Sequence, residues 1–226
     1  MAKTLIPAAD HARISAAVAQ AELASDGEIA TMVAAQSDDY RDWALLLTLL
    51  AGLVMLATIA AFPACLSAAL LTLSGAWHSS FSTGELIVAA LALQTLTVAL
   101  VWFALCWLPL RLALTPRSIK VARVRREAVR AFRIGIESRT RAATGVLIYL
   151  SLAEHRAEIV ADAAINMHVQ PGDWGDAMAA LTADVRDGRP GDGIVEAVEM
   201  VGALIARHFP PSHDDVNEMP DRLIEL

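Results

Sequence analysis

The 226-residue sequence lacks the residue spacings that mark common catalytic and metal sites. It has two cysteines without a CxxC pair, and its six histidines show neither HExxH nor a Cys/His ligand spacing, so a zinc site has no support. A GxxxxGKS phosphate loop and a GxSxG nucleophile elbow are also missing. Zinc enzymes, P-loop proteins and serine hydrolases are therefore poor models for this chain.

Charged residues are missing from two long stretches, residues 44–75 and 86–110. A bilayer core of roughly 30 Å needs about 20 helical residues, so each stretch is long enough to cross. We predict a two-helix transmembrane hairpin over residues 43–110, with a buried hairpin in a soluble core as the alternative. Pro63 is placed to end or kink the first helix, which leaves open whether residues 64–74 lie in the membrane core or at its interface. Cys65 and Cys106 fall within these stretches and are expected to be buried thiols.

Lysine and arginine are concentrated between residues 111 and 141, directly after the second stretch, and the connector WHSSFST has neither. Because basic residues close to a span are retained in the cytoplasm, the second span should exit there. The start of the sequence, MAKTLIPAADHARI, has no apolar core of signal-peptide length. We expect a multi-pass protein of the bacterial inner membrane, with both termini and the soluble domain in the cytoplasm.

A basic amphipathic helix is predicted within residues 111–143. At 100° per residue one arc of this helix carries its cationic residues, Lys120, Arg123, Arg126, Arg130 and Arg133. This arc is expected to contact anionic lipid headgroups; the alternative is a solvated face that acts as a topology signal. Arg125 falls on the apolar arc, where an ion pair would account for it. The remaining soluble segments are acidic, so a nucleic-acid partner is not expected.

The soluble segments predict an α/β domain split by the hairpin. Residues 1–42 contain a helix, with Asp10 as its expected cap, and the strand EIATMVAA. Residues 144–210 contain an apolar strand over 145–152, a turn at 153–156, a second strand over 157–161 and two amphipathic helices. The first strand lacks a sheet, so residues 29–33 should pair with residues 146–150. We predict a small mixed sheet sandwiched by helices and a flexible tail over residues 211–226.

The segments AEHRAEIVADAAI and AELASDGEI resemble the TPM-domain family, over roughly residues 8–36 and 130–210. The matching motifs are Gly27-Glu28-Ile29 at a strand entry, a Thr-Gly-Val-Leu strand at residues 144–147, and a hairpin from Glu154 to Asp162. The resemblance implies an α/β fold and offers membrane-complex maintenance, divalent-ion binding and a weak phosphatase activity. In the common family pattern a signal peptide exports the domain and a span follows it. Here the spans interrupt the domain, so extracytoplasmic roles transfer poorly.

Carboxylates supply the candidate site. Asp162, Asp173 and Asp176 could converge and bind a hard divalent cation such as calcium through oxygen. The alternative is structural: Asp173 and Asp192 stand where helix caps belong, and Glu158 would be a solvated residue with Arg156 as one partner.

We expect a non-catalytic module that contacts membrane lipids and binds a protein partner or helps to assemble a membrane complex. The alternative is a divalent-metal-assisted phosphatase. A channel-like oligomer of the hairpin is less favoured, because the predicted spans contain no ionisable residue to line a pathway.

Overall fold

The computed structural model describes residues 4–75, 80–135, 144–170, 172–211 and 221–226, and the chain divides into two compact units. The domain unit is formed by Met1–Asp38 together with Arg117–Leu226, and the hairpin unit is Asp39–Pro116. The hairpin unit therefore interrupts the domain unit in the sequence.

The domain unit is an α/β fold built on one mixed sheet. Its elements are α1 (Ala8–Glu22), β1 (Glu28–Ala34), α6 (Arg117–Gly135), β2 (Gly145–Ser151), β3 (Arg156–Ala161), α7 (Ala163–Asn166), α8 (Gly175–Arg186), α9 (Pro190–Ala206) and β4 (Ile224–Glu225). The strand order is β3-β2-β1-β4. β1 pairs in parallel with both β2 and β4, whereas β2 and β3 form an antiparallel pair. The predicted fold class, a small mixed sheet with helices, is confirmed.

The pairing of β1 with β2 joins the two halves of the domain across the hairpin. Ile29 lies opposite Val146 and Val33 lies opposite Leu150, so residues 29–33 pair with residues 146–150 as predicted from the sequence. Every residue of both strands is buried, as expected for central strands covered on two faces. The segment before the hairpin is thus part of the same sheet as the segment after it.

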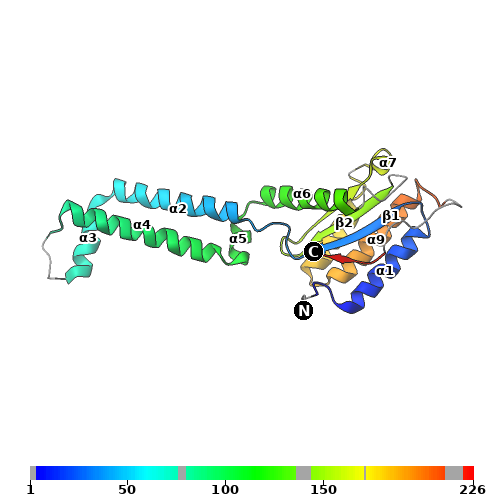
Figure 1. Ribbon diagram of the computed structural model, residues 1–226, viewed down its shortest axis with the longest axis horizontal. Coiled ribbons are helices and arrows are strands. Elements are labelled where there is room, and N and C mark those ends of the chain that lie inside the picture. Colours follow the sequence, from blue (N-terminus) through cyan, green and yellow to red (C-terminus); the bar gives the residue numbers. More distant parts are fainter. Residues whose placement is uncertain (1–3, 76–79, 136–143, 171, 212–220) are drawn as a thin grey trace. The chain divides into compact units, whose positions relative to one another are not determined.

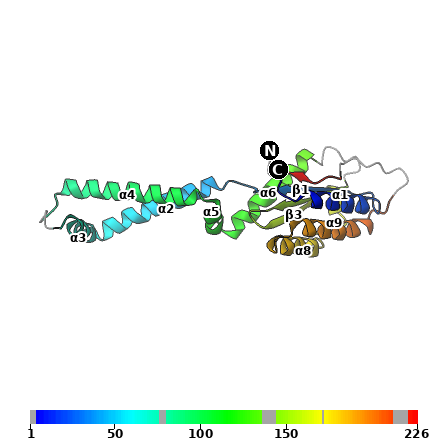
Figure 2. The same ribbon diagram turned by 90° about the horizontal axis from the view of Figure 1, so that it is seen from below.

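Helices cover the sheet on both faces (Figures 1 and 2). Alternate residues of β1 and β2, such as Ile29 and Val146, pack in one core with residues of α1, α8 and α9. The intervening residues, such as Met32 and Tyr149, pack in a second core against α6. Figure 1 shows α6 on one side of the sheet and α1 and α9 on the other. The two cores explain why β2 is apolar at nearly every position.

α1 and α9 approach each other closely at Gly202. A Cβ atom at this glycine would lie 2.6 Å from the Cβ of Ala21, well inside van der Waals contact. The glycine therefore permits the spacing of the two helices, which carry a large part of the first core.

The hairpin unit contains α2 (Arg41–Ala61), α3 (Pro63–Ser74), α4 (Thr83–Leu105) and α5 (Leu108–Leu114). Pro63 is the first residue of α3, so the proline ends the first long helix as its fixed backbone predicts. α4 begins with a capping box: the Ser82 backbone N–H donates to Glu85 Oε2 at 2.7 Å, and the Glu85 N–H donates to Ser82 Oγ at 3.4 Å. Gly52 of α2 faces Gln94 of α4, and a Cβ at Gly52 would lie 2.8 Å from Gln94 Nε2.

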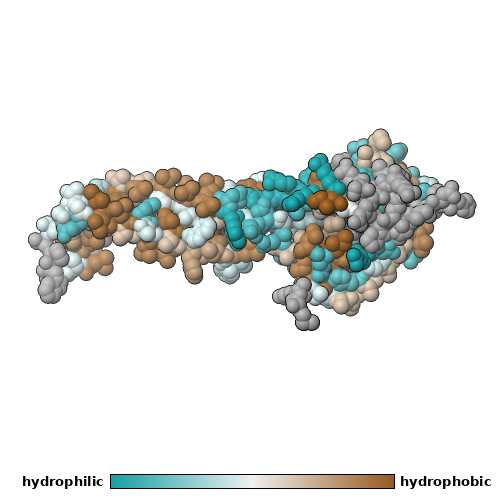
Figure 3. All heavy atoms as spheres, viewed as in Figure 1, coloured by the Kyte–Doolittle hydropathy of each residue, from teal (hydrophilic) through white to brown (hydrophobic). Residues whose placement is uncertain are grey.

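By length and composition, α2 and α4 could each cross a membrane. At 1.5 Å per residue, α2 is about 32 Å long and α4 is about 35 Å long. Their large apolar side chains face outward, including Leu49, Leu53, Val88 and Leu91, and brown side chains cover much of the hairpin in Figure 3. Cys65 and Cys106 are also exposed, which corrects the expectation of buried thiols. The outer surface of a helical hairpin that crosses a membrane faces lipid. In such a hairpin, a side chain on the outer surface would still have apolar surroundings.

Two expectations at the ends of the domain are wrong. Asp10 does not cap α1, because the helix begins at Ala8, directly after Pro7. The tail is not loose at its end: β4 pairs with β1, and Glu225 Oε1 accepts a hydrogen bond from the Ile6 backbone N–H at 2.9 Å. The tail carries too few apolar residues to signal a strand; the edge of the sheet supplies the pairing partner. Residues 212–220 lie outside the described part of the chain.

Candidate functional site

Asp162 has a structural role at the end of the sheet. It lies between β3 and α7 and is buried. Its Oδ2 accepts a hydrogen bond from the Gly145 N–H at 3.1 Å, and its own N–H donates to the Gly145 carbonyl at 2.9 Å. The carboxylate therefore secures the first residue of β2 beside the end of β3.

Asp173 and Asp176 lie at the start of α8 and line one shallow depression. Asp173 Oδ2 accepts a hydrogen bond from the Gln170 N–H at 2.8 Å. Trp174, and not Asp173, is the residue that precedes α8, so the predicted cap is wrong. Asp173 instead closes the loop that leads into the helix.

Asp192 does not cap α9 either, because it lies within the first turn of that helix. Its Oδ1 is 2.7 Å from Arg13 Nη1, which links α9 to α1. A negative charge in the first turn interacts favourably with the helix dipole, so Asp192 can stabilise the start of α9 without acting as its cap.

No group of three or more His, Cys, Asp or Glu side chains that could hold a metal occurs within the described ranges. Asp173 and Asp176 share a depression whose lining does not include Asp162. Calcium binding by these three carboxylates stays a prediction.

The cationic residues predicted on one arc of α6 have different surroundings. Arg123 has a side chain only 13% exposed, and its Nη1 lies 2.8 Å from Asp38 Oδ1. Arg126, Arg130 and Arg133 are exposed. Three of the predicted lipid-contact arginines therefore face outward. Arg123 instead forms an ion pair within the domain.

Arg125 is explained by an ion pair across the second core. Its Nη1 lies 3.1 Å from Glu158 Oε2 on β3. Glu158 is buried, so the expectation of a solvated residue is wrong. Its described partner is Arg125 rather than Arg156, because α6 covers this face of β3.

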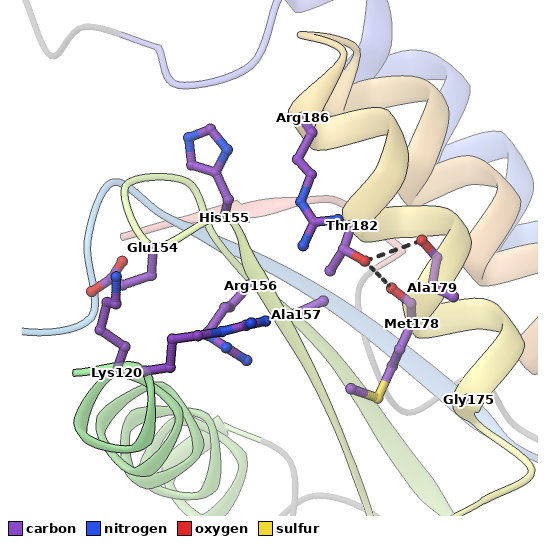
Figure 4. Close-up of a pocket in the computed structure, with 11 residues that line it drawn as sticks. Lys120, Glu154, His155, Arg156, Ala157, Gly175, Met178, Ala179, Thr182 and Arg186 are labelled. Atoms are coloured by element: carbon purple, nitrogen blue, oxygen red, sulfur yellow. Dashed lines mark hydrogen bonds between the residues drawn. The ribbon is translucent and has the colours of Figure 1, made fainter. Parts of the chain in front are cut away.

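A basic cavity of about 680 Å³ lies between α6, the β2–β3 turn and α8 (Figure 4). We define it by its lining residues: Arg117, Lys120, Glu154, His155, Arg156, Ala157, Gly175, Met178, Ala179, Thr182 and Arg186. In Figure 4, Lys120 and Glu154 lie at one side, Arg186 extends from α8 at the other, and Arg156 lies between them. Three segments distant in sequence thus bring cationic groups to one hollow.

Two of the polar groups in the basic cavity are already engaged. Glu154 Oε1 accepts from the Ser37 N–H at 3.1 Å, and its Oε2 accepts from the Ser151 hydroxyl. The Thr182 hydroxyl donates to the Met178 carbonyl at 2.8 Å, drawn as a dashed line in Figure 4. The cationic side chains are therefore the main polar groups with which the cavity can bind a ligand.

Sequence reasoning missed the basic cavity. Arg156 and Arg186 lie on separate elements, and neither stands in a recognisable motif. His155 was expected in a turn, and its φ of 49° confirms this. The signal that would have revealed the cavity is spatial: it requires knowing that α6 and α8 flank the same strand.

Glu22 is the one carboxyl in the described residues with a pKa strongly shifted upward. It lies at the end of α1, where its Oε1 accepts a hydrogen bond from the Ile29 N–H at 3.1 Å. Burial raises the pKa from 4.5 to about 8, against the lowering effect of this hydrogen bond, and the neighbouring carboxyls of Glu28 and Asp221 raise it further. The group is therefore mainly protonated at neutral pH.

Comparison with known proteins supports the fold. No protein-family model matches the chain, and no curated protein matches it. The solved structure of BA42 protein from the psychrophilic bacterium Bizionia argentinensis, determined by NMR, is similar with a TM-score of 0.57 and 16% sequence identity. The match covers 100% of this chain and 99% of that chain. At this identity the likeness supports the α/β fold alone.

Proposed function

We propose that the chain is a TPM-family protein of the bacterial inner membrane, with its domain in the cytoplasm as a non-catalytic binding module. The module would bind a protein partner or help to assemble a membrane complex. The observation that carries the proposal is the insertion of the apolar hairpin unit between β1 and α6 of one folded domain.

The pairing of β1 with β2 constrains the membrane topology. Both strands belong to one sheet, so the chain must return to the side of the membrane from which it left. Two crossings, by α2 and α4, satisfy this requirement. Arg111 and the basic residues of α6 follow α4 closely, which favours the cytoplasm as that side.

The exposed arginines of α6 support contact with the membrane surface. Arg126, Arg130 and Arg133 lie beside the exposed apolar residue Ile134. Near an anionic bilayer each charge contributes about 1 kcal/mol of attraction, and the apolar side chain can enter the headgroup region. This face of α6 is our proposed lipid-contact surface.

Topology reporters test the placement. Fusions at Ala2 and, through a flexible linker, after Leu226 should both report the cytoplasm, whereas a reporter inserted between Ser80 and Phe81 should report the outside. The internal fusion is the control, because it must give the opposite signal if α2 and α4 both cross. An outside signal from either terminus contradicts the proposal.

Native gels and turnover assays test the module. Extracted in mild detergent, the full chain should migrate in a complex larger than the chain alone, and migration as a lone chain in every mild detergent speaks against assembly.

Hydrolysis of generic phosphoesters, with and without calcium, should stay at background. Turnover that Asp162→Asn removes would favour the phosphatase alternative.

A further inference from the structure

The basic cavity carries more positive charge than its carboxylate balances. Arg117, Lys120, Arg156 and Arg186 surround one acidic residue, Glu154, in a chain whose formal net charge is −7. Like charges gathered in a hollow raise its potential and attract an anion, because the low-dielectric walls reduce screening. Such a concentration of cations in an acidic protein needs a reason.

Several arginines elsewhere in the domain are paired with carboxylates of the protein itself. Arg13, Arg123, Arg125 and Arg189 each pair with an aspartate or glutamate at 3.1 Å or less. Within the described ranges, Arg117, Arg156 and Arg186 form no ion pair with a carboxylate. In the part of the chain that the structure describes, the charges of these three guanidinium groups are therefore not neutralised by a carboxylate.

The shape and lining of the cavity fit a small phosphorylated molecule. Each guanidinium offers a planar fork of N–H donors that matches two phosphate oxygens. Ala157, Met178 and Ala179 supply an apolar wall for an uncharged part of the same molecule. A volume of about 680 Å³ lies in the range of small-molecule sites.

We propose that the basic cavity binds the phosphate group of a small phosphoester, with Arg156 and Arg186 as its principal contacts. The source of the phosphate is either a soluble molecule or a phospholipid headgroup. This inference names the class of ligand for the binding module proposed above. It rests on that proposal, because it treats the cavity as a site that binds a phosphoester and does not hydrolyse it.

Binding is measured on the full chain in zwitterionic detergent micelles by isothermal titration calorimetry. One arm adds inorganic pyrophosphate, and the other adds dihexanoyl phosphatidic acid below its critical micelle concentration, with dihexanoyl phosphatidylcholine as its zwitterionic control. Saturable binding in the first arm alone identifies a soluble source. Saturable binding of phosphatidic acid alone identifies a lipid source.

Three variants link binding to the cavity. Arg156→Gln and Arg186→Gln should each weaken binding about tenfold or more, because a charge-assisted hydrogen bond is lost. Ala179→Glu places a carboxylate on the exposed surface of α8 beside the cations and should abolish binding without disturbing the core. Arg207→Gln is the control: it removes an equal charge from an exposed site outside the cavity and should change affinity less than twofold.

The inference is overturned if neither probe binds, or if Arg156→Gln, Arg186→Gln and Ala179→Glu all bind as tightly as the wild type. Comparable amide hydrogen exchange in β2 and β3 of each variant separates lost contacts from lost folding. The membrane proposal is tested separately by the topology reporters. A cavity that binds phosphate in a chain whose termini lie outside would refute the cytoplasmic placement and leave the phosphate site standing.

Discussion

The raised pKa of Glu22 makes the stability of the domain depend on pH. In the unfolded chain this carboxyl releases its proton near pH 4.5, whereas in the folded domain it does so near pH 8. Between these values the folded state binds more protons than the unfolded state, so the free energy of unfolding falls as pH rises. The penalty is absent below pH 4.5 and complete above pH 8.

The magnitude follows from the two pKa values. One pKa unit is worth about 1.36 kcal/mol, so the complete penalty is about 5 kcal/mol, of which about 2 kcal/mol develops between pH 6 and pH 8. Glu22 retains some contact with solvent, which reduces the expected difference over this range to about 1–2 kcal/mol. The Glu22→Gln variant removes the titration and keeps an amide oxygen that can accept from the Ile29 N–H.

The assay is a pair of urea titrations, at pH 6 and pH 8, on the full chain in detergent micelles, followed by far-ultraviolet circular dichroism. The wild type should lose about 1–2 kcal/mol more stability between the two pH values than Glu22→Gln does. Other titrating groups are common to both proteins, so the difference isolates Glu22. Equal losses in the two proteins would show that burial does not hold this carboxyl in its protonated form.

Two further predictions concern packing and the end of the sheet. Gly202→Ala should lower the free energy of unfolding by about 1–3 kcal/mol, because the new Cβ would clash with Ala21. Gly175→Ala is the control and should not destabilise the domain, because no atom lies within 4 Å of its new Cβ. Equal urea midpoints for the two variants would contradict this prediction. Asp162→Ala should lower the free energy of unfolding by about 1–2 kcal/mol, because it leaves the Gly145 N–H without its acceptor. Asp162→Asn keeps an acceptor oxygen and should lower it by under about 1 kcal/mol. A calcium-dependent rise in the melting temperature of the wild type that Asp162→Asn removes would instead assign Asp162 to an ion site.

Periodicity and hydrophobicity were sufficient to predict the sheet, the covering helices and the apolar hairpin. The run over residues 145–152 is apolar at nearly every position, which predicts a central strand because both of its faces must be covered. Residues 29–33 could be assigned to the same sheet because one helix and one strand bury too little surface alone.

Features that depend on tertiary contacts could not be read from the sequence. β4 has two residues, and its pairing depends on a free edge of β1 rather than on its own pattern. Asp173 and Asp192 stand close to helix starts, and a shift of one or two residues in the boundary decides whether each can cap. Arg156 and Arg186 come together because α8 packs beside β3, which no local signal encodes.

The position of β1 in the middle of the sheet has a consequence for biogenesis. β1 leaves the ribosome well before its partners, because β2 emerges more than one hundred residues later and β4 later still. In the membrane topology that we propose, α2 and α4 are inserted during that interval, while β1 has no sheet to join. The apolar strand is then exposed to chaperones and proteases, so the delay between insertion of the hairpin and closure of the sheet becomes a point at which quality control can act on this protein.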